Sequence, residues 1–248
     1  MAELPPHDSP IFADITNGRL DLRDELICSI DPPGCTDIDD ALHVKLLPNG
    51  NYQLGVHIAD VSHYVKEGSF MDREARKRGN TIYLVDRRID MLPRELGEDL
   101  CSINSNVDRY AFTVLWEVTP PTSPLTESQK AKLSTQSGAS KSSSAASSSP
   151  ENSEEDDGLG VKVVEVSFHK TVIRSRANLA YADAQYRIED LSQQDQLSKN
   201  LRILNSIAKV LKKRRIAKGA LSLASPQVRF IKDESTHDPI DLEMYESK

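Results

Sequence analysis

The chain has 248 residues, of which 38% are apolar, and a formal net charge of −7, so it can bury the core of one or two domains. It contains no apolar run of about 18 residues, the length that crosses a bilayer, and its start shows no signal-peptide pattern. Its three cysteines (Cys28, Cys35 and Cys101) have no C-x-x-C spacing. This argues against a zinc site or a disulfide framework and favours reduced thiols in a nuclear and/or cytoplasmic protein.

The first half of the chain has the pattern of a β-rich domain. Residues 1–20 are Pro-rich and polar, and we expect an N-terminal arm there, with β-structure from residue 22 onward. The apolar runs 41–47 and 52–58 flank Pro-Asn-Gly-Asn, which predicts a hairpin because Asn-Gly suits positive φ. A short helix is expected over 71–78, ended by Gly79. Two further strands are expected over residues 81–85 and 111–118.

The segment 119–160 differs in composition from the rest of the chain. It has nine serines between Ser134 and Ser149, followed by an acidic run over 151–157, and almost no large apolar side chain. Such a segment cannot bury enough surface to offset its ordering entropy, so we expect a disordered, low-complexity insertion. Strand-like sequence resumes at Val161. The segment therefore predicts an insertion within one domain rather than a boundary between two domains.

A long helix is expected over about residues 195–218. Apolar residues recur on one face of this segment, and Gly219 is suited to ending the helix. This apolar stripe consists of Leu197, Leu201, Leu204, Ala208 and Leu211. Basic residues crowd the final turns: Lys209, Lys212, Lys213, Arg214, Arg215 and Lys218. They are expected to complement the helix dipole and to keep the outer face solvated. For Lys212 to Arg215 the alternative is contact with phosphates or a role in nuclear targeting.

The stretch CSIDPPGCTDIDDALH concentrates four aspartates, Asp31, Asp37, Asp39 and Asp40, within ten residues. Its two prolines and its glycine shape a loop between apolar segments. Neighbouring carboxylates repel one another unless a cation or a shared proton offsets the repulsion. A solvated acidic turn and a site for a hard divalent cation such as Mg²⁺ both remain open, whereas the spacing disfavours an EF-hand.

Several other residues have more than one interpretation. Tyr83 lies on a predicted strand, where a half-buried aromatic of a sheet is the default expectation. His57 and His63 would share one strand face, either as a metal pair or in packing and hydrogen bonding. Three aspartates near strand and turn ends are expected to act as caps: Asp90, Asp99 and Asp108.

Long strings of the sequence resemble a known family. These include DLRDELICSIDPPGCTDIDDALH, LGVHIADVSHYV, NTIYLVDRRIDMLPREL and VDRYAFTVLWE, and they are similar to the RNB catalytic domain of the ribonuclease II family. SRANLAYADAQYRI, IAKVLKKRRIAKGAL and SPQVRF are most similar to the branch of that family found in the eukaryotic RNA exosome. The resemblance covers nearly everything from residue 21 to about 242 except the insertion.

This resemblance implies a Mg²⁺-dependent 3′→5′ exoribonuclease that degrades single-stranded RNA to nucleoside 5′-monophosphates. The family's four active-site aspartates match Asp31, Asp37, Asp39 and Asp40, which would hold one or two Mg²⁺ ions. Asp39 matches the residue whose loss abolishes catalysis and spares RNA binding. Tyr83 matches the tyrosine that packs against the 3′-terminal nucleotide, so base stacking is the alternative to a half-buried position in a sheet. With this resemblance, Arg87 and Arg88 either line an RNA path or face water. The implied partners are single-stranded RNA and core subunits of the RNA exosome, and no membrane.

The resemblance also implies a domain organisation. We expect an α+β fold with a mixed or antiparallel β-sheet core and packed helices. Its first part would cover 21–118 and its continuation 161–248, and a full RNB domain would extend further than this chain does. A non-catalytic RNA-binding or exosome-interacting fragment is the alternative to an active nuclease.

Overall fold

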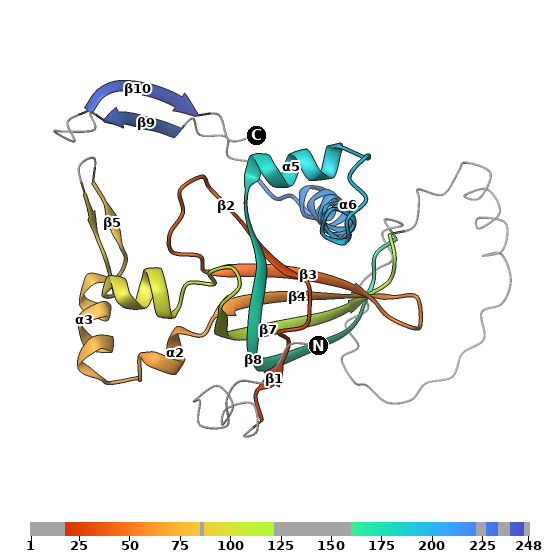
Figure 1. Ribbon diagram of the computed structural model, residues 1–248, viewed down its shortest axis with the longest axis horizontal. Helices are drawn as coiled ribbons and strands as arrows, with labels where there is room; N and C mark the ends of the chain where they lie inside the picture. The colour runs from red at the N-terminus through yellow and green to blue at the C-terminus, as the bar shows by residue number, and fades with distance from the viewer. Residues whose placement is uncertain (1–17, 85–86, 122–159, 222–226, 233–238, 246–248) are drawn as a thin grey trace, which may run out of the picture.

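The structure is a computed structural model that describes residues 18–84, 87–121, 160–221, 227–232 and 239–245 (Figure 1). The expected arm up to residue 17 and the expected insertion over 122–159 lie outside these described residues. The main sheet consists of β1 (Leu20–Asp21), β2 (Ile27–Asp31), β3 (Asp40–Leu46), β4 (Tyr52–Ala59), β7 (Asp108–Val118) and β8 (Val163–Ala180). Two small sheets are formed by β5 (Ile82–Tyr83) with β6 (Arg88–Ile89), and by β9 (Gln227–Lys232) with β10 (Pro239–Tyr245).

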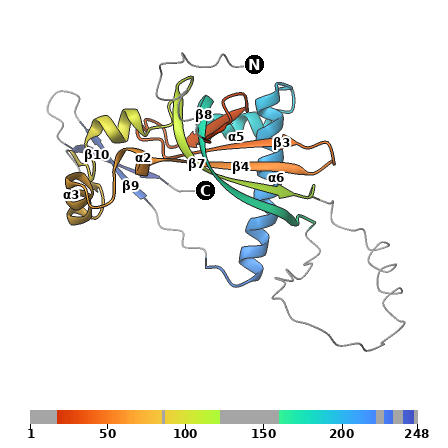
Figure 2. The same cartoon turned by 90° about the horizontal axis from the view of Figure 1, so that it is seen from below.

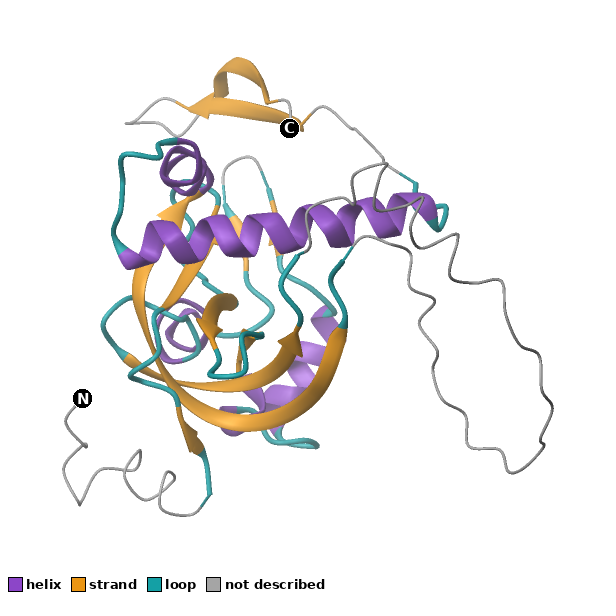
Figure 3. Ribbon diagram, turned by 90° about the vertical axis from the view of Figure 1, so that its right-hand side faces the viewer, coloured by secondary structure: helices purple, strands orange, loops and turns teal. Residues whose placement is uncertain are grey.

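Helices surround this sheet. They are α2 (Val61–Tyr64), α3 (Phe70–Arg78), the π-helix η1 (Glu95–Leu100), α5 (Tyr181–Glu189) and α6 (Gln196–Ala217). In Figure 1, α5 and α6 lie together above the sheet and α2 and α3 lie at its left end. Figure 3 shows the long α6 crossing over the curved strands. Sheet and helices together confirm the expected α+β fold, and no helix among the described residues has both the length and the apolar character of a membrane span.

The main sheet closes on itself through β8. Its strand order is β1-β8-β2-β3-β4-β7, and β8 also pairs with β7. The first two thirds of β8 lie antiparallel to β7, whereas Ser175 to Ala180 lie parallel to β2. A closed sheet leaves few unpaired edges. β1 pairs with β8 at Leu20, so this end of the expected arm belongs to the sheet.

The predicted hairpin and the two predicted helices are confirmed. β3 and β4 pair from Asp40↔Ile58 to Leu46↔Tyr52, with Gly50 at φ +85° in the turn. α3 ends at Gly79 with φ +77°, as the sequence predicted. α6 begins after Asp195, whose side chain accepts a hydrogen bond from the Ser198 N–H. The three cysteines are all free thiols, as expected.

A chain of buried polar side chains crosses the inside of the closed sheet. Its members lie on four adjacent strands, and His57 and both threonines are fully buried. The links are His43 Nδ1 to His57 Nε2 at 2.8 Å, His57 Nδ1 to Thr113 Oγ1 at 2.8 Å and Thr113 Oγ1 to Thr171 Oγ1 at 2.7 Å. Since Thr171 donates to the Ala111 carbonyl, Thr113 donates to Thr171 and the His57 Nδ1–H donates to Thr113, and a neutral His57 then accepts at Nε2 from the His43 Nδ1–H.

We expect this chain to make folding sensitive to acid. Burial, together with the neighbouring His43 ring, lowers the pKa of His57 to about 3. Below about pH 6.5 the unfolded state therefore binds a proton that the folded state does not bind. The free energy of unfolding then falls by about 1.4 kcal/mol for each unit by which the pH is lowered. Urea titrations at about pH 7 and about pH 5.5 should show this loss, and the variant His57→Gln should show a shallower dependence. A His57 ring that protonates near pH 6.5 in the NMR spectrum of the folded protein would contradict the account.

The expectation that His57 and His63 share one strand face is wrong. β4 ends at Ala59, and His63 lies on α2, where its ring contacts the ring of Tyr110 at 4.1 Å between centroids. The expected role of both rings in packing and hydrogen bonding is confirmed.

Asp90, Asp99 and Asp108 are ion-pair partners rather than caps. Asp99 pairs with Arg109 at 2.8 Å. Asp108 pairs with the buried Arg23 at 3.2 Å and with Arg174 at 2.6 Å. The partners of Asp108 lie 85 and 66 positions away in the sequence, so local spacing offered no signal for them.

Candidate active site

The four aspartates lie on one short connection between two neighbouring strands. Asp31 is the last residue of β2, Asp40 is the first residue of β3, and the two strands are antiparallel. We call residues 31–40 the acidic loop. At its start the Cys35 N–H donates to the Pro32 carbonyl at 3.2 Å, and Gly34 has φ +79°. Proline followed by glycine is the sequence that a tight turn of this kind requires, which explains the local conformation.

The middle of the acidic loop is anchored to the core. Ile38 is 4% exposed and packs in the main hydrophobic cluster, which stabilises the loop by roughly 2 kcal/mol. Its N–H donates to the Ser102 hydroxyl at 3.0 Å, and its carbonyl accepts from the Ile103 N–H at 2.9 Å. The Ser102 hydroxyl donates in turn to the Thr36 carbonyl at 3.0 Å. The aspartates on either side of Ile38 are therefore held by a rigid backbone.

The carboxylates of the acidic loop lie close enough to perturb one another. Burial and the charges of Asp37, Asp40 and Asp31 raise the pKa of Asp39. Burial and Asp31 raise the pKa of Asp40. Both shifts mean that removal from water and mutual repulsion disfavour the charged forms. A cation beside the loop would offset both effects.

The donor set fits a hard divalent cation. Carboxylate oxygens are the ligands that Mg²⁺ prefers, and the buried Oδ2 atom of Asp31 has no hydrogen-bond partner in the structure. A buried carboxylate oxygen without a partner is costly unless something positive satisfies it. Among the described residues, no three His, Cys, Asp or Glu side chains converge closely enough to hold a metal ion. The four carboxylates are therefore neighbours that would have to move together to form a cage.

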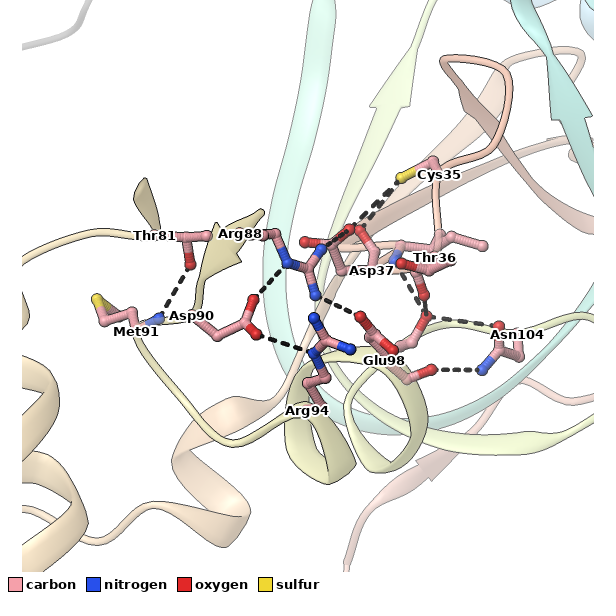
Figure 4. A network of polar contacts seen from close by, with 12 residues as sticks. Cys35, Thr36, Asp37, Thr81, Arg88, Asp90, Met91, Arg94, Glu98 and Asn104 are labelled. Carbon is pink, nitrogen blue, oxygen red and sulfur yellow. Dashed lines mark hydrogen bonds and ion pairs between the residues drawn. The ribbon is translucent and has the colours of Figure 1, made fainter. Parts of the chain in front are cut away.

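Arg88 ties the acidic loop to the β5–β6 hairpin and to η1. Its guanidinium contacts Asp37 Oδ1 at 3.2 Å and forms ion pairs with Asp90 and Glu98 (Figure 4). Burial alone would lower the pKa of Arg88, but Asp37, Asp90 and Glu98 raise it. The sequence left the role of Arg88 open between an RNA path and solvent. The structure shows instead a side chain that is 17% exposed and restrains Asp37.

Tyr83 lies on the same hairpin as Arg88. The two residues are directly paired across β5 and β6, so their side chains leave the hairpin on one face. The Tyr83 side chain is 70% exposed, unlike a half-buried aromatic of a sheet. Because Arg88 also contacts Asp37, the hairpin that carries the exposed Tyr83 ring is in direct contact with the acidic loop.

Comparisons with known proteins agree with this arrangement. The family model described as RNB domain matches residues 19–143 and 155–248. The chain is 46% identical over 242 residues to the exosome complex exonuclease dis3 of Schizosaccharomyces pombe, covering 96% of this chain and 21% of the relative. It is also 46% identical to the human exosome complex exonuclease RRP44 over 228 residues, covering 92% of this chain and 20% of the relative. The chain thus spans about a fifth of the length of these curated relatives.

Solved structures show the same fold. A structure of Mycoplasma genitalium RNase R in complex with double-stranded RNA superposes with a TM-score of 0.69 at 22% identity, covering 94% of this chain and 35% of that one. A structure of yeast Ssd1, described as a pseudonuclease, has a TM-score of 0.58 at 20% identity, covering 84% of this chain and 21% of that one. The resemblance found in the sequence is confirmed, and the chain belongs to the RNB domain family.

Proposed function

We propose that the chain carries the acidic metal site of a Mg²⁺-dependent 3′→5′ exoribonuclease that degrades single-stranded RNA to nucleoside 5′-monophosphates. One observation supports this most strongly. Four carboxylates lie on one core-anchored loop, where burial and neighbouring carboxylates raise the pKa of Asp39 and Asp40, and a buried oxygen of Asp31 lacks a partner. The relatives named as exosome exonucleases point to the same activity.

In this proposal Asp31, Asp37 and Asp40 hold Mg²⁺, and Asp39 completes the site or orients the attacking water. Bound Mg²⁺, in one or two ions, would make the water more acidic and neutralise charge on the phosphate oxygens. The water oxygen forms a bond to the phosphorus of the terminal nucleotide, and the bond from that phosphorus to the O3′ of the preceding nucleotide breaks. Arg88 acts as a positioning residue because it holds Asp37 from the hairpin side.

The direction and product of the reaction test this proposal. A 5′-labelled single-stranded oligonucleotide, incubated with the chain and Mg²⁺, should shorten one nucleotide at a time, and chromatography should show nucleoside 5′-monophosphates. EDTA should stop the reaction. Internal cuts, nucleoside 3′-monophosphates, or release unaffected by EDTA would each contradict it.

We expect Tyr83 to stack on a base of the bound RNA. Base–aromatic stacking contributes about 1–3 kcal/mol and tolerates any sequence, as a non-specific exonuclease requires. Tyr83→Ala should weaken RNA binding on the order of tenfold to 100-fold, whereas Tyr83→Phe should retain it. Fluorescence anisotropy in EDTA measures this without cleavage. Because Tyr83 is exposed, the thermal midpoint should not change, and equal binding by the wild type and the alanine variant would exclude stacking.

A non-catalytic RNA-binding or exosome-interacting role is the second candidate. Two observations favour it: the carboxylates do not converge on a cage in the described residues, and a protein described as a pseudonuclease shares the fold. RNA binding that persists in EDTA, with no nucleotide release at any Mg²⁺ concentration, would favour this candidate.

The proposal includes one RNB domain interrupted by the segment 119–160. The strands on either side of that segment pair with each other from Asp108↔Arg174 to Val118↔Val163. The Thr119 N–H also donates to the Lys162 carbonyl at 2.9 Å. Because the named relatives are exosome exonucleases, core subunits of the RNA exosome are the proposed protein partners, in the nucleus, the cytoplasm or both.

A further inference from the structure

The charge of the chain is unevenly distributed around α6. Residues 196–232 contain no aspartate or glutamate, although the whole chain has a net charge of −7. The same segment contains ten basic residues: Lys199, Arg202, Lys209, Lys212, Lys213, Arg214, Arg215, Lys218, Arg229 and Lys232. The lack of acidic residues and the number of basic residues together make this segment strongly positive.

Exposed cations gather at the C-terminal end of α6. We call this set the α6 basic surface, and it consists of Lys209, Lys212, Lys213, Arg215 and Lys218, all exposed. Arg202, earlier in the helix, has a structural role, because its guanidinium donates to backbone carbonyls around α5. On α3, by contrast, Arg76 and Arg78 each pair with an acidic residue four positions earlier. The sequence of α6 offers no such partner.

The helix dipole does not account for the α6 basic surface. A cation interacts with the dipole only near the last turn and contributes about 0.3–1 kcal/mol. Lys209 and Lys213 are four positions apart, and Lys212 and Arg215 are three apart. Like charges at these spacings destabilise a helix by about 0.2–0.5 kcal/mol per pair. These repulsions act against the dipole interaction, and a bound polyanion would offset them.

The same end of α6 is hollowed. A cavity of about 570 Å³ is lined by Val163, Leu211, Arg214, Arg215 and Lys218. Its lining combines the apolar side chains of Val163 and Leu211 with the cationic side chains of Arg214, Arg215 and Lys218. Exposed apolar side chains of Leu211 and Ile216 lie between the cations. An apolar surface bordered by guanidinium and ammonium groups suits unpaired bases with their phosphates better than a duplex, whose bases are stacked inside.

The α6 basic surface is separate from the acidic loop. The Asn200 amide donates to the Val44 carbonyl on β3, which fixes the first half of α6 against the sheet. At 1.5 Å per residue, Lys218 lies about 27 Å further along the helix axis. In Figures 2 and 3 the C-terminal end of α6 projects past the strands.

We propose that the α6 basic surface is a second contact site for single-stranded RNA, which binds phosphates at a distance from the acidic loop. This inference rests on the proposed function, because a nuclease site at the acidic loop makes single-stranded RNA the polyanion that the chain would bind. Its cations contact the backbone of the strand without reading sequence.

The salt dependence of RNA binding tests the inference. The full chain is titrated into a fluorescent oligouridylate of about 20 nucleotides in EDTA, from about 50 to about 200 mM NaCl. The test variant combines Lys212→Gln, Lys213→Gln and Arg215→Gln, which remove three charges with little change in helix propensity. Three lost phosphate contacts should make the slope of log K against log salt shallower by about 2, and should weaken binding at about 0.1 M salt by roughly 100-fold.

A charge-matched control separates local contact from overall charge. It combines Lys66→Gln, Arg76→Gln and Lys77→Gln, which also remove three exposed cations, and should keep the wild-type slope within about 0.5. Equal slopes for the wild type and the α6 variant would overturn the inference. Equal losses of RNA affinity in the α6 variant and in the charge-matched control would also overturn it. So would an α6 variant that loses only binding to an acidic peptide, which would identify a protein ligand instead. Absence of Mg²⁺-dependent nucleotide release by the wild type, with the α6 effect on the slope intact, would instead overturn the proposed function alone.

Discussion

Asp39→Asn should abolish metal-dependent nucleotide release while RNA binding in EDTA stays within about twofold of the wild type. The substitution removes one carboxylate charge from the acidic loop and leaves the shape of the side chain nearly unchanged. Metal-ion catalysis supplies several kcal/mol of transition-state stabilisation, so the rate should fall by at least about 100-fold. Single-turnover assays on 5′-labelled RNA measure the loss directly.

The matched control for this variant is Glu165→Gln, the same carboxylate-to-amide change on an exposed position of β8. It should leave the rate within about twofold. The thermal midpoint of Asp39→Asn should not fall, because burial and neighbouring carboxylates raise the pKa of Asp39 and make its charge a cost to the fold. A variant that retains the wild-type rate would remove Asp39 from the catalytic site.

Gly55→Ala should be among the most destabilising single-methyl additions in this protein. A Cβ atom at position 55 would lie 2.1 Å from His43 Cε1 and 3.0 Å from His57 Nε2. Neither ring can move freely, because both are buried and joined by the hydrogen bond between them. Overpacking typically costs 1–3 kcal/mol, and disruption of the polar chain adds to that, so we expect a loss of roughly 3 kcal/mol in the free energy of unfolding.

Gly97→Ala is the natural comparison, since a Cβ atom there would meet nothing within 4 Å. Urea titrations should place this variant within about 0.5 kcal/mol of the wild type or slightly above it. If both variants unfolded at the same urea concentration, the close packing of Gly55 against His43 would be disproved.

The sequence predicted those elements that depend on residues close together in the chain. The Asn-Gly turn predicted the β3–β4 hairpin, and Gly79 and Gly219 predicted where α3 and α6 end. The acidic loop was recognised because its aspartates are adjacent in the chain. The exposure of Tyr83 agrees with the stacking interpretation, although its contact with RNA stays a prediction.

The features that the sequence did not predict depend on residues far apart. Arg88 and Asp37 are 51 positions apart, and Arg23 and Asp108 are 85 apart. The strand expected from Val161 extends to Ala180 because β8 changes partner from β7 to β2. The π-helix η1 contains Gly97 and has no side-chain cap at its start. None of these arrangements leaves a periodic or capping signal, since tertiary contacts create them.

Metal binding by the acidic loop is the claim on which the proposed function depends, and Mn²⁺ titration followed by electron paramagnetic resonance tests it most directly. The wild-type chain should remove one or two equivalents of Mn²⁺ from solution, with competition by Mg²⁺. Asp31→Asn, which alters the buried carboxylate oxygen that has no partner, should weaken this binding at least about tenfold. A wild-type chain that binds no Mn²⁺, or that binds it equally well after Asp31→Asn, would contradict the account.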